Sequence, residues 1–160
     1  MTTYYQLEPE VAGGWGANTE ADTSVHPPVV HALHCEFQGW LGDELVESFP
    51  CFLVSERVGQ ALQQAGLSGF FLADAEISLA TEFTERHEKT ELPRFRWLKV
   101  MGRAGKADLG LSDSHLLVVS ERTLALLRQF SLSNAEVSES GANKSIERRA
   151  PITRRWSRGR

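Results

Sequence analysis

Histidine and cysteine side chains gather in one short stretch of this 160-residue sequence, where they could in principle ligate a metal ion. His31, His34 and Cys35 form a His-x-x-His-Cys cluster of nitrogen and sulfur donors. Structural zinc normally takes four such ligands at characteristic spacings, and the remaining candidates, His26 and Cys51, follow no such spacing. On a strand, moreover, His31 and His34 point to opposite faces. The sequence therefore predicts no metal site and no cofactor.

Side chains that could build a hydrolytic site are scattered along the chain. Asp43 and His115 would need a serine nucleophile, but Ser55 and Ser120 are expected to cap helices, and no Gly-x-Ser-x-Gly elbow occurs. Neither cysteine has an identifiable base that would activate it as a nucleophile. We expect a protein that is not an enzyme, and keep as the alternative an enzyme whose site is assembled from Asp43, His115 and Glu91.

Acidic side chains form a more informative pattern. One group lies just beyond an aromatic residue, and a second recurs through a polar segment that we expect to be exposed. Carboxylates beside an aromatic residue suit the binding of a basic protein, since charge raises the association rate and a buried aromatic residue supplies holding energy. The predicted partner-binding residues are Trp40, Asp43, Glu44, Glu47, Glu82, Glu85, Glu88 and Glu91.

The net charge of -4 hides an uneven distribution along the chain. Residues 144–160 hold seven of the 17 Lys and Arg residues and one of the 21 acidic residues. By subtraction, residues 1–143 carry 10 basic and 20 acidic side chains, a net charge of -10. Such a body should repel nucleic acid and anionic membranes and attract basic partners.

The basic C-terminal segment carries arginines interleaved with Trp156 and lacks helical or strand periodicity. Arginine and tryptophan together can contact phosphates and bases, so nucleic-acid binding through this segment is a second alternative. We expect residues 141–160 to be a disordered tail and residues 1–140 to be a single domain.

A strand-cap-helix unit is predicted twice, over residues 52–68 and 117–133. In each unit a short apolar strand leads into Val-Ser-Glu-Arg, where the serine is a good N-cap and the glutamate favours the positive end of the helix. Eight of the 17 positions are identical at an offset of 65 residues. An internal repeat with two equivalent helices packed against one sheet is expected; independent use of the same cap is the alternative.

The remaining elements complete an α+β pattern with a mixed or antiparallel sheet. Gly13 to Gly16 are expected in a mobile loop, residues 70–83 in a strand that alternates apolar and polar side chains, and residues 95–100 in another strand. The N-terminus lacks the features of a signal peptide, which predicts a cytoplasmic protein with reduced, buried cysteines.

Packing and turn residues are spread along the chain at Tyr4-Tyr5, Pro9 to Gly14, Trp40 to Asp43, Phe52 to Ser55, Leu67 to Gly69, Leu92 to Leu98 and Leu117 to Glu121. In this order they resemble those of small bacterial immunity-type proteins, which accompany secreted polymorphic toxins. The resemblance covers about residues 4 to 138 and implies a protein that binds and neutralises a cognate toxin without catalytic residues of its own.

Overall fold

The fold is that of a computed structural model that describes residues 2–141, and it is α+β, as expected. Helices α1 (Glu56–Gln64), α2 (Thr81–Arg86) and α3 (Glu121–Leu127) are short, and none in this part of the chain is long and apolar enough to span a membrane. The strands are β1 (Tyr4–Glu8), β2 (Glu10–Val11), β3 (Gly13–Trp15), β4 (Glu20–Asp22), β5 (Val29–Ala32), β6 (His34–Phe37), β7 (Leu45–Ser48), β8 (Cys51–Ser55), β9 (Phe70–Ala73), β10 (Glu76–Leu79), β11 (Phe95–Val100), β12 (Gly102–Arg103), β13 (Leu109–Leu111), β14 (Leu117–Ser120) and β15 (Glu136–Glu139).

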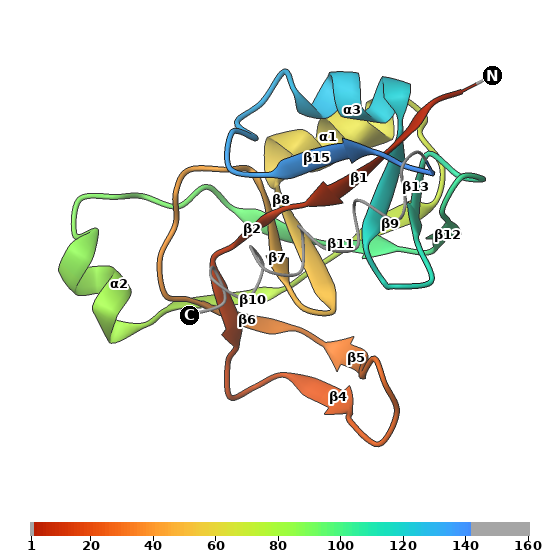
Figure 1. The fold of residues 1–160 in the computed structure, drawn as a ribbon. Helices are drawn as coiled ribbons and strands as arrows, with labels where there is room; N and C mark the ends of the chain where they lie inside the picture. The colour runs from red at the N-terminus through yellow and green to blue at the C-terminus, as the bar shows by residue number, and fades with distance from the viewer. Residues whose placement is uncertain (1, 142–160) are drawn as a thin grey trace.

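Two five-stranded sheets with matching patterns form the body. Their strand orders are β2-β7-β8-β11-β9 and β12-β13-β14-β1-β15. In each sheet the first pair of strands is parallel and the other three pairs are antiparallel. The described part of the chain adds a three-stranded sheet, β10-β6-β3, and the β4–β5 hairpin, which projects from the body (Figure 1).

Two chain segments tie the large sheets together. The β1–β2 segment pairs first with β14 and β15 of one sheet and then with β7 of the other. The β11–β12 segment makes the reverse passage, from β8 and β9 to β13. Both segments cross between the sheets, and residues of both sheets fill one apolar cluster, so the two sheets share a core.

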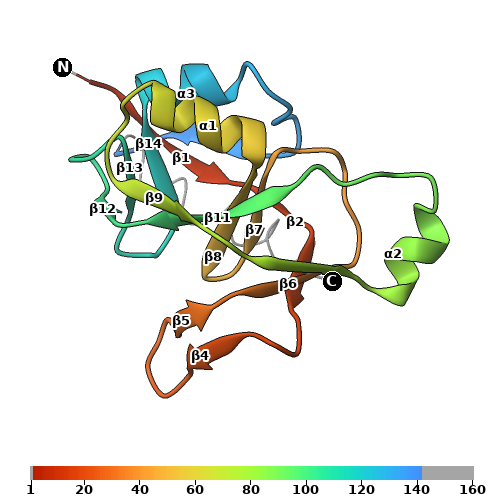
Figure 2. The ribbon, with the colours of Figure 1, turned by 180° about the vertical axis from the view of Figure 1, so that it is seen from behind.

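The sequence explains why α1 and α3 form where they do. The Ser55 hydroxyl accepts a hydrogen bond from the Val58 amide at 3.3 Å, and Ser120 accepts the equivalent bond from Thr123 at 3.3 Å. Each serine satisfies an amide that a helix leaves without an internal partner. Gly66, at a φ of 69°, ends the first helix. The two helices contact one another on one side of the strands (Figure 2).

Two apolar clusters fill the interior. The larger one lies between the two five-stranded sheets and the α1–α3 layer, and the smaller one lies between the sheet that contains β8 and the three-stranded sheet. Strand β8 is buried at all five positions because it has a cluster on each face. This explains its continuous run of apolar residues.

The structure corrects three sequence predictions. The strand-cap-helix units belong to two different sheets, not to one. The segment 70–83 breaks into β9, β10 and the start of α2, so it is not a single strand. Gly13 to Trp15 form strand β3 instead of a loop, because a glycine at position 13 lets β3 approach the backbone of β6. All of the predicted tail except Gly141 lies outside the described residues.

Candidate functional site

Trp40 and Asp43 form a local structural unit. The indole Nε1 of Trp40 donates to the backbone oxygen of Asp43 at 2.7 Å, and its ring packs edge-on against Phe95 with 6.1 Å between ring centroids. The Asp43 carboxylate is fully buried and accepts hydrogen bonds from the backbone and side-chain nitrogens of Asn134, at 2.9 and 3.0 Å. Asp43 therefore ties the loop before β7 to the loop before β15.

Glu44 lies at the centre of a second buried network. Its carboxylate accepts hydrogen bonds from the Ser55 hydroxyl, from two nitrogens of Arg57 and from the Ser131 amide, at 2.7 to 3.1 Å. The Arg57 guanidinium holds the pKa of Glu44 at about 2, well below its usual value. Glu44 thus joins the first strand-cap-helix unit to the end of the second.

The burial of these carboxylates corrects part of the predicted binding surface. Asp43, Glu44 and Glu47 are 0, 6 and 3% exposed. Buried carboxylates require hydrogen-bonding or charged partners, and Asp43 and Glu44 find theirs within the fold. These three residues therefore do not belong to an exposed acidic surface.

The other four predicted acids occupy a different environment. Glu82, Glu85, Glu88 and Glu91 are all exposed, on α2 and the loop that follows it. Residues 80–94, which we call the acidic arm, project from the body in both views (Figures 1 and 2). Phe83, only 1% exposed, anchors the arm in the smaller apolar cluster.

Ion pairs with arginine occur at some carboxylates of the body but at none of the arm glutamates. Among the described residues, no Lys or Arg lies within ion-pair distance of any of the four arm glutamates. Four other carboxylates, those of Glu44, Glu56, Asp74 and Asp108, each pair with an arginine. The four arm glutamates thus keep their negative charge outside any ion pair with a Lys or Arg of the described residues.

His34, a candidate metal ligand in the sequence, is instead held by hydrogen bonds. The Asn18 amide donates to its Nδ1 at 3.1 Å, and its Nε2 lies 2.7 Å from the Ser78 hydroxyl. Because Nδ1 accepts, a neutral ring carries its proton on Nε2 and donates it to Ser78. His34 in this state cannot act as the base for that serine. No group of three or more His, Cys, Asp or Glu residues within positions 2–141 is placed to hold a metal ion.

The two cysteines are buried thiols. Burial raises the pKa of Cys35 to about 11 and that of Cys51 to about 12. Both side chains are therefore protonated at neutral pH, where a thiol is a poor nucleophile. They serve as small apolar groups in the smaller cluster.

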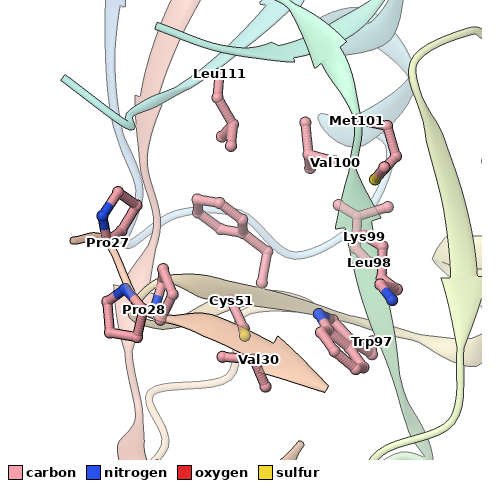
Figure 3. A pocket seen from close by; sticks show the side chains of 12 residues that line it. Pro27, Pro28, Val30, Cys51, Trp97, Leu98, Lys99, Val100, Met101 and Leu111 are labelled. Atoms are coloured by element: carbon pink, nitrogen blue, oxygen red, sulfur yellow. The ribbon is translucent and has the colours of Figure 1, made fainter. Parts of the chain in front are cut away.

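A pocket of about 190 Å³ opens beside β11, between β8 and the base of the β4–β5 hairpin (Figure 3). Its lining is mainly apolar, and Lys99 is its one charged residue. The sequence predicted a strand at Trp97 but not this pocket. The spacing of Trp97 and Lys99, which puts both on one face of the strand, was the available signal. The lining residues are Pro27, Pro28, Val30, Pro50, Cys51, Phe52, Trp97, Leu98, Lys99, Val100, Met101 and Leu111.

The residues of the alternative enzyme site are not gathered around this pocket. Asp43 is occupied by Asn134, and Glu91 lies on the acidic arm. His115 sits in the turn before β14, with a positive φ of 66° and its ring edge-on to that of His26. None of the three lines the pocket.

No protein-family model matches the sequence, and no curated protein matches it significantly.

Proposed function

We propose that this chain is a cytoplasmic binding protein that neutralises a basic toxin or effector enzyme, and that the acidic arm makes the contact. The observation that carries the proposal is the exposure of the Glu82, Glu85, Glu88 and Glu91 carboxylates, none of which forms an ion pair with a Lys or Arg among the described residues. The toxin class of the partner rests on the sequence resemblance to immunity-type proteins.

Electrostatics supports a role for the arm in recognition. Between positions 80 and 94 the four glutamates face three cations, Arg86, Lys89 and Arg94, and Arg94 pairs with Glu56 outside the arm. The arm also belongs to a body of net charge -10 over residues 1–143. Uncompensated charge on a projecting segment speeds the encounter with a cationic protein, and it does so less at high salt.

The body that carries the acidic arm contains the two strand-cap-helix units. We infer that these units are copies of one repeated element. The support is that Ser55 and Arg57 bind Glu44 as Ser120 and Arg122 bind Asp108. Glu44 lies directly before β7, which pairs with β8 of the first unit. Asp108 lies directly before β13, which pairs with β14 of the second unit.

The test is co-expression of the full chain with the products of its neighbouring genes, followed by capture and measurement of association rates. In the arm variant, Glu82, Glu85, Glu88 and Glu91 are replaced together by glutamine. The control variant removes the same number of charges from exposed positions elsewhere, through Glu20→Gln, Asp113→Asn, Glu121→Gln and Glu139→Gln.

We expect the arm variant to lose about tenfold in association rate at low salt and the control variant to lose much less. Toxin inhibition should fall in parallel. Capture of no partner from a neighbourhood free of toxin genes would count against toxin neutralisation. A captured partner that associates with the arm variant as fast as with the natural chain would eliminate the arm as the contact.

A further inference from the structure

The pocket beside β11 carries two polar side-chain groups that both donate hydrogen bonds. Trp97 is 6% exposed, and its indole N–H makes no hydrogen bond with any described residue and is not sealed from solvent. Figure 3 places the indole nitrogen on the side of the ring that faces the cavity. An indole N–H in a largely buried side chain normally has an acceptor, so this donor is available to a ligand.

Lys99 supplies a positive charge on the same wall. Its ammonium lies 4.4 Å from the centroid of the Trp97 ring and 5.1 Å from that of Phe71. Within residues 2–141 no carboxylate lies within 4.0 Å of this ammonium. Two aromatic faces therefore hold the cation in place without neutralising it.

The shape and walls of the pocket limit the apolar part of a ligand. A dry cavity of about 150 Å³ is known to accept benzene, so a volume of about 190 Å³ suits one ring or one branched aliphatic group. Pro27, Pro28 and Pro50 are among the lining residues, and proline has little backbone freedom to lose when a ligand binds. The protonated Cys51 thiol adds a further apolar surface.

We propose that this pocket binds a small free monocarboxylate that bears one aromatic or branched aliphatic group. The apolar group occupies the cavity, and the carboxylate accepts from the Trp97 N–H and the Lys99 ammonium. No oxygen acceptor is present among the lining side chains. A peptide C-terminus would bring an amide N–H that needs such an acceptor, so the free acid is the better match. This inference does not rest on the acidic arm, because no arm residue lines the pocket.

The test compares 3-phenylpropanoate with its neutral amide, 3-phenylpropanamide, on the full chain. Binding is followed by NMR through the indole N–H resonance of Trp97. We expect the acid to shift this resonance with a Kd on the order of 1 mM, as befits a ligand of this size, and the amide to bind at least about tenfold more weakly. Equal shifts by acid and amide, or no shift up to about 20 mM acid, would overturn the proposal.

Lysine variants test whether the Lys99 ammonium binds the carboxylate of the ligand. Lys99→Gln should weaken binding of the acid about tenfold and leave binding of the amide unchanged, whereas Lys106→Gln, at an exposed lysine outside the pocket, should change neither. If Lys99→Gln does not fold, the comparison of acid and amide on the natural chain still tests whether the pocket prefers a carboxylate. N-acetylphenylalanine tests a protein C-terminus as the ligand. If it binds about tenfold more tightly than 3-phenylpropanoate, the assignment of a free acid as the ligand is wrong.

Discussion

The guanidinium of Arg57 donates from Nε and Nη2 to the two carboxylate oxygens of Glu44, each at 2.7 Å. Both hydrogen bonds exist in full only while the carboxylate is ionised, which is why its pKa falls to about 2 from an ordinary value of 4.5. The unfolded chain therefore takes up a proton at Glu44 at higher pH than the folded chain does.

Folding stability should consequently depend on pH through Glu44. The contribution of its depressed pKa is fully present above about pH 4.5 and is lost as the pH falls toward about 2. In urea unfolding, Glu44→Gln should be less stable than the natural chain at about pH 7, and the difference should shrink at about pH 2. Glu20→Gln, at an exposed position, serves as the control. A stability difference for Glu44→Gln that stays constant across this range would contradict the prediction.

The two serine caps should contribute similarly to stability. Ser55 and Ser120 are buried, each accepts from the third amide of its helix, and each donates to a carboxylate. Replacing either by alanine should lower the free energy of unfolding by about 1 to 2 kcal/mol.

Chemical denaturation of the Ser55→Ala and Ser120→Ala variants measures both losses, with Ser24→Ala in an exposed turn as a control expected to change stability by less than about 0.5 kcal/mol. Losses that differ by more than about 2 kcal/mol would argue against equivalent roles for the two caps, and so against the repeated unit.

Two adjacent glycines offer a sharp comparison in β3. A Cβ at position 13 would lie 2.0 Å from the backbone oxygen of Glu36, whereas a Cβ at position 14 would meet no atom within 4 Å. Gly13→Ala should therefore disrupt the pairing of β3 with β6 and destabilise the fold by about 3 kcal/mol or more, while Gly14→Ala should be nearly neutral. Thermal unfolding of the two variants tests this, and equal melting temperatures would refute it.

The sequence predicted local structure better than it predicted the neighbours of each residue. The start of α1 followed from Ser55 and Glu56, because a helix cap acts over a few residues. The passage of β1–β2 between two sheets was not predictable, since strand pairing depends on residues more than 100 positions away.

The candidate site shows the same difference between local features, which the sequence predicts, and contacts with distant residues, which it does not. Charge alone could not separate the buried Glu44 from the exposed Glu82, because that difference depends on distant partners such as Ser131. The Gly13 strand was missed because glycine also favours loops, and only the approach of β6 explains its presence in a strand. Trp97 and Lys99 were visible on one strand, but the opposite wall of their pocket comes from a hairpin 70 positions earlier in sequence, at Pro27.

The buried cysteines should resist modification in the folded protein. With pKa values raised to about 11 and 12, Cys35 and Cys51 hold almost no thiolate at about pH 8. Iodoacetamide should label neither residue in the native chain and both residues in urea, as read by mass spectrometry. Native labelling of either residue at the rate of a free thiol would contradict this assignment.

Phe83 should control the order of the acidic arm. It is 1% exposed, packs into the smaller apolar cluster and lies tilted against the His87 ring, with 4.9 Å between the ring centroids. Helix α2 itself has only six residues, and its N-cap, Ala80, makes no side-chain hydrogen bond. A helix this short has little stability of its own. Phe83→Ala should therefore cost about 3 kcal/mol and increase hydrogen exchange throughout positions 81–91, while Phe71→Ala, at a half-exposed ring, should spare those amides. If exchange in the arm is unchanged by Phe83→Ala, another contact must hold the arm glutamates in place, and the anchoring role of this ring is wrong.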